Sequence, residues 1–385
     1  MRKRHNAVGI MMAVLTAVML SSSGAALAAE KLAVLDVEFA PRVMEAGEKV
    51  RFDFRLTRDA AVVLEVFSPH YDLVRTVPSG YALPRGNNSL YWDGRDDWGV
   101  QVPPEAYMFA LTATSADGEM VVYNPTTWSG GEELEMTLDR LENSGEGYKV
   151  HFTVPHLARV DIRAGIRNGP LLSNILVWSP LAPGSHAPYW DGLDSTGTCR
   201  VLDEPSAHII VQAHKLPDNT ILVTGAKKGY DTWREELLQK RPAMTGATIN
   251  YEDVRSAAMV RLEEGISTFY ATGASLNPPV HFAVYEENDL TTGLAEKNVR
   301  TYSGQARFIL EVAPESLQDF NNGRYEIVVF LDNERMDEEE HAQSPYTYIL
   351  DTTKLRDGLH TLTFNQAGLN GQITSYTFKI NVQNG

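Results

Sequence analysis

The feature that most constrains this chain is an internal repeat. Residues 51–100 align with residues 149–198 at a constant offset of 98 and without a gap. Both copies contain YWDG followed by an Asp and a Gly, as YWDGRDDWG at residues 91–99 and YWDGLDSTG at residues 189–197. Because self-similarity at a fixed spacing means that one structural unit is used twice, the repeat predicts two domains of the same fold.

Each copy carries the pattern of short, half-buried strands. Apolar and polar residues alternate, as in RFDFRL at residues 51–56 and KVHFTV at residues 149–154, which is the period-two pattern of a strand with one face in a core. Copies of about 95 residues with Gly, Pro, Asn or Asp turns every 8–12 residues are typical of immunoglobulin-like β-sandwiches. After the YWDG turn the second copy has three extra residues, so we expect Tyr107 to correspond to His208 in the last strand.

The chain changes character after Gly229. Residues 231–240 predict a helix, with Thr232 and Glu235 as a capping box and Pro242 beyond its end. Strand patterns then return, so the predicted fold is all-β, with three immunoglobulin-like sandwiches in tandem and a short helical linker before the third. The predicted boundaries are a signal peptide at 1–28, domains at 29–125 and 126–226, a linker at 227–245 and a third domain at 246–385.

The first residues have the features of an export signal. A basic start, Arg2 to Arg4, precedes an apolar run at residues 7–20 and a small-residue cleavage pattern at Ala26-Leu27-Ala28. No cysteine lies near this point, so the chain lacks the lipobox of a bacterial lipoprotein. We therefore expect a periplasmic or extracellular protein that is not embedded in a membrane.

The charge balance limits the classes of partner. The formal net charge is -16, and an acidic surface repels phosphate backbones and anionic lipid, so nucleic acid is an unfavourable partner. The single cysteine, Cys199, cannot form an internal disulfide. We expect it to be a small buried residue or an incidental exposed thiol.

The YWDG stretch itself suggests a calcium loop, because Asp93, Asp96 and Asp97 could supply oxygen ligands. The second copy argues against this interpretation, since Asp97 becomes Ser195 there. A turn in which aspartates accept bonds from backbone amides and glycines take positive φ is the preferred interpretation. It makes Trp92 and Trp190 core residues, and it leaves the chain with no predicted metal or cofactor.

No catalytic motif stands out. The mature chain lacks Gly-x-Ser-x-Gly, Ser-x-x-Lys and the phosphate-binding glycine motifs. Carboxylates gather at Glu133 and Glu135 and again at residues 337–340, and we expect the latter run to be a solvated loop. The sequence therefore predicts a protein that is not an enzyme, with an unrecognised hydrolase left open as an alternative.

At the level of motifs the repeats resemble the immunoglobulin-like domain of the flagellar hook-capping (FlgD-type) family. The matching residues of the first copy are Val74-Arg75-Thr76, Gly86, Trp92-Asp93-Gly94, Asp96, Gly99, Val102-Pro103 and Tyr107. The second copy keeps Trp190-Asp191-Gly192, Asp194 and Gly197. Residues 350–362 resemble a bacterial immunoglobulin-like module. These resemblances imply a type of domain and no activity, and the export signal makes this chain unlike the hook-capping proteins themselves.

We therefore expect a non-enzymatic scaffold or adaptor of the bacterial cell envelope that binds another protein or an envelope assembly. The candidate partner-binding residues are those that the first copy adds to the repeat, Arg95, Asp97 and Trp98, together with Trp128. A carbohydrate-binding accessory protein is the alternative, because Trp98, Trp128, Trp178 and Tyr81 could present rings to a sugar.

Overall fold

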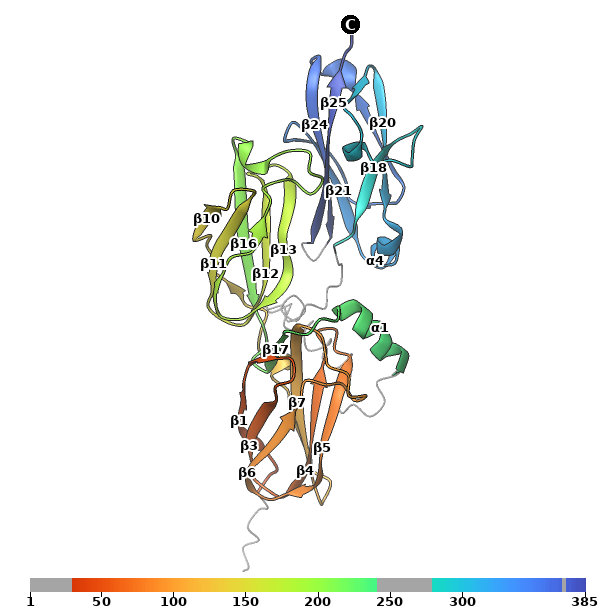
Figure 1. Cartoon of the computed structure of the whole chain (residues 1–385). Helices are drawn as coiled ribbons and strands as arrows, with labels where there is room; N and C mark the ends of the chain where they lie inside the picture. The colour runs from red at the N-terminus through yellow and green to blue at the C-terminus, as the bar shows by residue number, and fades with distance from the viewer. Residues whose placement is uncertain (1–29, 241–278, 369–371) are drawn as a thin grey trace, which may run out of the picture. The chain divides into compact units, whose positions relative to one another are not determined.

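The computed structural model describes residues 30–240, 279–368 and 372–385 (Figure 1). The predicted signal peptide, residues 241–245 of the predicted linker and the start of the predicted third domain lie outside the described residues. Within the described ranges the chain is all-β, with three immunoglobulin-like sandwiches, as predicted.

The first sandwich consists of two sheets that enclose one aromatic core. One sheet has the order β1 (Val34–Ala40), β3 (Val50–Leu56), β6 (Gly86–Trp92). The other has the order β2 (Val43–Glu45), β17 (Thr220–Thr224), β7 (Glu105–Ser115), β4 (Ala60–Phe67), β5 (Leu73–Leu83), with β8 (Met120–Tyr123) also paired to β7. The alternation in β3 buries Phe52 against Phe109 of β7, with ring centroids 4.7 Å apart.

The second sandwich has the same central strands. One sheet contains β10 (Arg140–Asn143), β11 (Tyr148–Val154), β14 (Gly184–His186) and β15 (Tyr189–Trp190). The other has the order β13 (Leu171–Leu181), β12 (Ala158–Ile166), β16 (Ala207–Lys215), β9 (Glu133–Leu134). Two 3-10 turns, η1 (Pro125–Thr127) and η2 (Val201–Asp203), lie before β9 and before β16.

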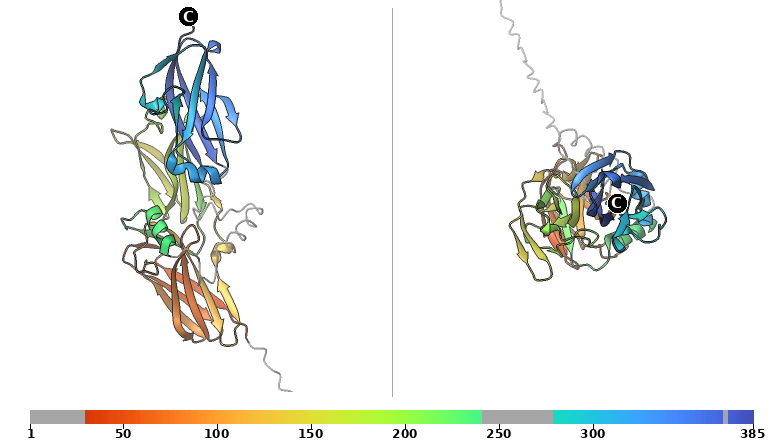
Figure 2. Two further views of the ribbon diagram at one scale, coloured as in Figure 1. Left: turned by 90° about the vertical axis from the view of Figure 1, so that its right-hand side faces the viewer. Right: turned by 90° about the horizontal axis from the view of Figure 1, so that it is seen from above.

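The third sandwich pairs a three-stranded with a five-stranded sheet, visible as two layers in Figure 2. The first sheet has the order β18 (Phe282–Glu286), β20 (Gln305–Val312), β23 (Tyr346–Asp351). The second has the order β19 (Arg300–Tyr302), β25 (Ile373–Val382), β24 (Gly358–Gly368), β21 (Tyr325–Leu331), β22 (Glu334–Glu339). The short helical pieces are η3 (Leu294–Glu296), η4 (Pro314–Ser316), α4 (Leu317–Asn322) and η5 (Thr352–Lys354).

The acidic run at residues 337–340 is not the predicted loop. Asp337 to Glu339 belong to β22, the outermost strand of its sheet, which pairs with β21. Charged side chains suit an edge strand, because they discourage pairing with other chains. A run of carboxylates is therefore compatible with a strand as well as with a loop.

One strand of the predicted second domain, 126–226, belongs to the first sandwich. β17 follows the second sandwich in sequence, yet it pairs antiparallel with β7 and parallel with β2 of the first sandwich (Figure 1). Ile221 and Val223 are fully buried in the first core. A short apolar strand can complete either sandwich, so the sequence pattern does not say which sheet takes it.

The predicted alignment of the last strands is shifted by one residue. Val62 pairs with Ala113 in the first sandwich, and its counterpart Val160 pairs with Ala213 in the second. The final strands therefore correspond at an offset of 100, and the counterpart of Tyr107 is Ala207, not His208. A shift of one residue moves a side chain to the other face of the sheet, which is why His208 is exposed.

The predicted helix is present as α1 (Tyr230–Lys240). It begins at Tyr230, so Thr232 lies inside the helix and the predicted capping box is wrong. The helix is more than a linker, because Trp233 and Leu237 are buried in the core of the first sandwich. Their spacing of four residues places both side chains on one face.

Candidate functional site

The first YWDG turn is held closed by a buried aspartate. Asp96 is only 2% exposed, and its Oδ1 accepts hydrogen bonds from the backbone N–H groups of Trp98 and Val100, both at 2.9 Å. Gly94 and Gly99 have φ values of +71° and +78°, which favour glycine. The acidic side chain therefore satisfies the backbone of its own loop.

The second turn repeats this arrangement. Asp194 is 5% exposed, and its two carboxylate oxygens accept from the backbone N–H groups of Thr196, at 3.1 Å, and Cys199, at 2.6 Å. The indole N–H of Trp190 donates to the Leu193 carbonyl, as that of Trp92 does to the Arg95 carbonyl. The interpretation of YWDG as a strand end followed by a turn is confirmed.

No three His, Cys, Asp or Glu side chains converge as a cation-binding group within the described ranges. Oδ1 of Asp93 accepts from the Arg95 backbone N–H at 3.3 Å. Asp97 bonds a neighbouring strand instead: its Oδ1 accepts from the Thr76 backbone N–H at 2.9 Å, and its own N–H donates to the Val74 carbonyl.

These contacts assign roles to the candidate residues of the first turn. The Asp97 side chain links the turn to the Val-Arg-Thr element of β5 by accepting from Thr76, whereas in the second copy the Ser195 hydroxyl donates to the carbonyl of Leu172, the counterpart of Val74. The Arg95 guanidinium donates to the Gly99 carbonyl at 2.7 Å, across the same turn. Arg95 and Asp97 therefore shape the loop, whatever else they bind.

Trp98 and Trp128 are the two exposed candidates. Trp98 is 43% exposed, and the Lys240 ammonium lies 5.7 Å from its ring centroid. Trp128 is 56% exposed, follows η1, and contacts Tyr123 edge to face with ring centroids 5.8 Å apart. Arg95, Asp97 and Trp98 share one turn, whereas Trp128 belongs to the segment between the first two sandwiches.

Helix α1 braces the first turn, which sequence reasoning missed. The indole N–H of Trp233 points to Oδ2 of Asp96 at 3.4 Å. Arg234 pairs with Asp72 at 2.6 Å, which ties the same helix to the loop after β4. The four-residue spacing of the apolar Trp233 and Leu237 could have predicted that one face of this helix packs against a core.

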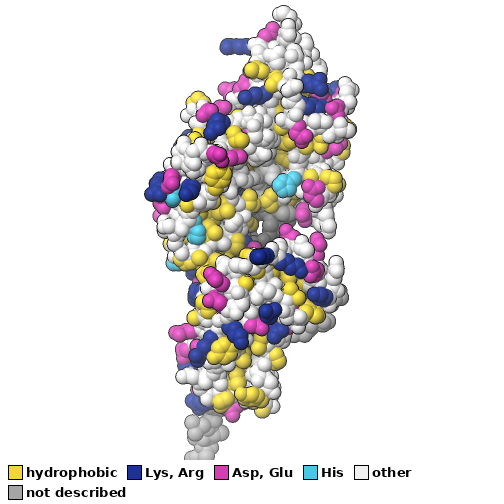
Figure 3. Space-filling view, in the orientation of Figure 1, with side chains coloured by type: hydrophobic (Ala, Val, Ile, Leu, Met, Phe, Trp, Pro, Cys, Tyr) yellow, Lys and Arg dark blue, Asp and Glu magenta, His cyan; other side chains and the backbone are white. Residues whose placement is uncertain are grey.

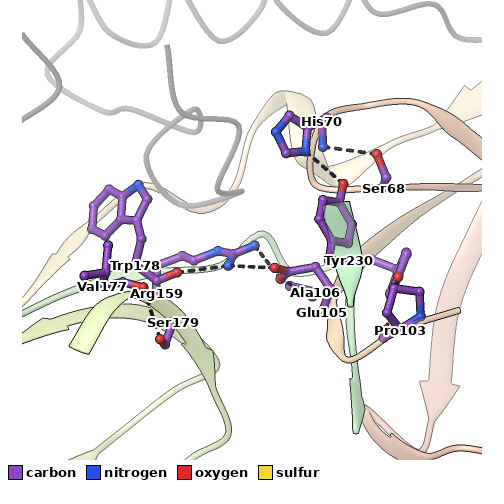
Figure 4. A network of polar contacts seen from close by, with 11 residues as sticks. Ser68, His70, Pro103, Glu105, Ala106, Arg159, Val177, Trp178, Ser179 and Tyr230 are labelled. Atoms are coloured by element: carbon purple, nitrogen blue, oxygen red, sulfur yellow. Dashed lines mark hydrogen bonds and ion pairs between the residues drawn. The ribbon is translucent and has the colours of Figure 1, made fainter. Parts of the chain in front are cut away.

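A polar network joins the first two sandwiches (Figure 4). Arg159 of β12 is 3% exposed; its guanidinium pairs with Glu105 of β7 at 2.6 Å and donates to the Trp178 carbonyl at 3.0 Å. In the first copy the position of Arg159 is occupied by Ala61. The replacement of an alanine by an arginine within a strand could have indicated that Arg159 makes a special contact. The sequence alone did not indicate that its partner is Glu105.

The same figure shows a histidine in an unusual environment. His70 Nδ1 lies 2.8 Å from the Tyr230 hydroxyl at the start of α1 (Figure 4). Burial, and then the positive charge of Arg234, lower the pKa of His70 to about 4. Its imidazole is therefore neutral at pH 7, and at that pH the contact with Tyr230 is a neutral hydrogen bond.

Cys199 and the carboxylates of Glu133 and Glu135 lie in the second sandwich. Burial, followed by the charge of Asp194, raises the pKa of the half-buried Cys199 thiol to about 12, so the reactive thiolate is scarce. Glu133 and Glu135 are exposed on the second sandwich. Trp178, one of the proposed sugar-binding rings, is half-buried within β13, whereas Tyr81 is 72% exposed.

Residues 40–117 match the family model of the FlgD Ig-like domain. Among solved structures, FlgD from P. aeruginosa is 20% identical, with 30% of this chain and 84% of that chain covered and a TM-score of 0.20. Truncated FlgD from Helicobacter pylori strain 26695 is 18% identical, with 31% and 81% covered and a TM-score of 0.20.

The fibronectin(III)-like modules of CbhA from Clostridium thermocellum are 9% identical, with 90% of this chain and 94% of that chain covered and a TM-score of 0.19. These TM-scores are too low to carry a functional conclusion. No match was found among curated proteins. Over the part of the chain that the structure describes, no helix combines the length and the hydropathy needed to cross a membrane.

Proposed function

We propose that this protein, whose residues 40–117 form a FlgD-type immunoglobulin-like domain, is a non-enzymatic scaffold or adaptor of the bacterial cell envelope. In this proposal the chain is exported by the leader at residues 1–28 and binds another protein through its sandwiches. The charged and polar groups of the YWDG turns serve the fold, which leaves exposed aromatic side chains as the binding groups.

The observation that carries the proposal is an exposed tryptophan on a braced loop. The turn that bears Trp98 is tied to β5 through Asp97 and to α1 through Asp96, yet 43% of the Trp98 side chain remains exposed. Tryptophan is enriched among the residues that dominate binding energy at protein interfaces. A loop that is already ordered loses little conformational entropy when its tryptophan is covered.

The experiment is photo-cross-linking in intact cells of the native organism. A photoreactive phenylalanine analogue replaces Trp98 or Trp128, and in a matched control it replaces Leu359, which is 68% exposed in the third sandwich. We expect a discrete cross-linked protein from Trp98 or Trp128 and none from Leu359. Absence of any protein adduct at both tryptophans would contradict the proposal.

The carbohydrate-binding alternative has its own readout. Tyr81 and Trp128 are exposed rings that could stack on sugars. Binding on a glycan array that disappears in Trp98→Ala or Trp128→Ala, together with no protein adduct in cells, would replace the adaptor by a sugar-binding protein. Turnover of a substrate that is lost on substituting Glu133 or Glu135 would instead favour a hydrolase.

A further inference from the structure

The outer edge of β16 in the second sandwich corresponds to an edge of the first sandwich that is already occupied. β7 and β16 are equivalent strands, because each pairs with the corresponding central strand, β4 or β12. On its free side β7 pairs with β17 at residues 105–108 and with β8 at residues 111–114. Ile221 and Val223 of β17 enter the core. β2 then covers the far side of β17.

Residues 208–212 of β16 correspond to residues 108–112 of β7 at the offset of 100, and neither β17 nor β8 has a counterpart along them among the described residues. β9 pairs with β16 only at Ala213 and His214. Along residues 208–212 the described part of the chain provides β16 with one neighbour, β12, and no second one. Such an edge presents its outward backbone N–H and C=O groups to any extended segment that approaches.

The open edge borders an apolar groove of about 530 Å³. Met136, Leu138 and Leu141 line one side, and residues 207–211 of β16 line the other. Ile210 is 48% exposed, whereas its counterpart on β7, Ala110, is fully buried. Figure 3 shows hydrophobic side chains exposed over the second sandwich, with acidic, basic and histidine side chains close by.

The groove has room because the second copy uses smaller side chains. Tyr107, fully buried on β7, corresponds to Ala207, and Phe109 corresponds to Ile209. An occupant strand therefore needs larger apolar side chains at its inward positions than the Ile and Val of β17. A strand with such side chains would fill the groove to the packing density of a protein interior.

Charge further restricts the occupant. Glu135, Asp139 and Asp203 flank the groove-lining residues in sequence and are exposed. Arg140 pairs with Glu142 at 3.0 Å, and the Arg167 guanidinium lies 3.4 Å from Nδ1 of His208 at one end of the edge. The exposed carboxylates of Glu135, Asp139 and Asp203 favour a segment with Lys or Arg beside its apolar core.

We infer that the edge of β16 at residues 208–212 binds an extended segment of a partner protein, with alternating large apolar residues and basic flanks, by strand addition. The segment runs antiparallel to β16, as β17 runs along β7. Main-chain hydrogen bonds supply affinity, and the groove selects the alternate side chains. This inference rests on the proposed adaptor function and names the site through which the adaptor holds its partner.

The test uses the full-length mature protein and the peptide KKTFLFTKK, with KKTFPFTKK as the matched control, because proline cannot complete the backbone ladder. We expect KKTFLFTKK to bind in isothermal titration and to slow amide hydrogen exchange at residues 208–212. Exchange at residues 105–108, which are already paired with β17, is expected to stay unchanged. The control peptide is expected to do neither.

Substitutions locate the site. Leu138→Lys places a charge in the groove and is expected to weaken binding by about tenfold or more. Met120→Lys, on an exposed position of the first sandwich, is expected to leave the affinity unchanged. Ile210→Lys, exposed on the same edge, repels the basic peptide and provides a second variant if Leu138→Lys unfolds.

Three outcomes overturn the inference: no binding, equal binding of the proline peptide, or slow exchange at residues 208–212 in the free protein. Protection there that rises with protein concentration would assign the edge to a second copy of this chain instead. A failed peptide test with a cross-linked partner at Trp98 removes the edge site and keeps the adaptor function. Failure of both experiments removes both.

Discussion

At the scale of single residues, the carboxylates of Asp96 and Asp194 in the YWDG turns accept backbone hydrogen bonds that a neighbouring strand would accept in a sheet. Asp96 and Asp194 each accept hydrogen bonds from two backbone N–H groups of their own loop. An unsatisfied buried amide costs about 1–3 kcal/mol. The cost explains why these two aspartates are kept in both copies while Asp97 is exchanged for Ser195.

Calcium is therefore expected to have little effect on the stability of this protein. The oxygens of Asp96 are already bonded to N–H groups, and a cation would have to displace those bonds. Thermal unfolding followed by circular dichroism, with and without millimolar calcium, measures the effect. A rise of many degrees that is lost in the Asp93→Asn, Asp96→Asn double variant would restore the metal-loop interpretation.

His70 makes stability depend on pH. Its pKa is about 4 in the folded protein and 6.5 in the ordinary state, so between these values the unfolded chain binds a proton that the folded chain does not. Above pH 6.5 His70 is neutral in both states and does not destabilise the folded protein. As the pH drops from 6.5 towards 4, protonation of His70 in the unfolded chain lowers the free energy of unfolding. The loss is about 1–3 kcal/mol at the acidic end.

The comparison of variants isolates this effect from other titrating groups. We expect His70→Gln to lose less stability than the wild type between pH 7 and pH 4.5 in urea titrations. His156→Gln, at an exposed position, is expected to follow the wild type. Identical slopes for all three proteins would show that His70 titrates alike in the folded and unfolded chains.

At the scale of elements, α1 closes the end of the first sandwich. Trp233 and Leu237 are 1% and 2% exposed, although the helix is only eleven residues long. An isolated helix of this length is marginal in water, so its order derives from packing. The helix and the loop after β4 therefore stabilise one another through Tyr230 and Arg234.

Trp233→Ala is expected to lower the free energy of unfolding by about 3–5 kcal/mol, because it leaves a cavity in the core and removes the bond to Asp96. Leu238→Ala changes a residue that is 37% exposed on the same helix, and we expect about 0.5 kcal/mol or less. Urea denaturation measures both. Equal effects would mean that α1 is a loose linker, as its sequence alone suggested.

The sequence predicted most strands and missed how some of them combine. The alternation of apolar residues in β3 and β11 is a local signal, and both strands are present as expected. The sheet that β17 joins depends on contacts with residues more than a hundred positions away, which no local pattern encodes. The one-residue error at Ala207 arose because motif similarity at a Pro-containing turn outweighed the weaker alternation of the strand.

The candidate site shows the same division. The turn and the core positions of Trp92 and Trp190 followed from comparing the two copies. The bond of Asp97 to Thr76 of β5 could not be predicted, because the two residues are 21 positions apart and the backbone path of β5 is set by the fold. Arg95, Asp97, Trp98 and Trp128 remain predictions as partner-binding residues.

At the scale of the whole molecule, the Glu105–Arg159 pair couples two sandwiches that each have their own core. Removing one member of a buried ion pair leaves the other charge without compensation, at a cost of about 3–5 kcal/mol. The pair is therefore suited to fixing how the two domains meet, because it is stable only when both are in place.

A double-mutant cycle measures this coupling. Arg159→Met and Glu105→Gln are each expected to destabilise the protein, and the double variant is expected to lose less than the sum, by about 0.5–3 kcal/mol. The single variants are also expected to separate the unfolding of the two sandwiches into distinct steps in calorimetry. Additive effects and an unchanged transition would mean that the pair is incidental to the junction.

The return of β17 to the first sandwich has a consequence for the order in which the chain can fold. Residues 30–123 do not contain every strand of the first sheet pair, because the strand at residues 220–224 is still to come. As the chain is synthesised from its N-terminus, the second sandwich can close first, while the first sandwich still has an exposed edge. A chaperone that shields that edge would bind the first sandwich until residues 220–224 have been synthesised.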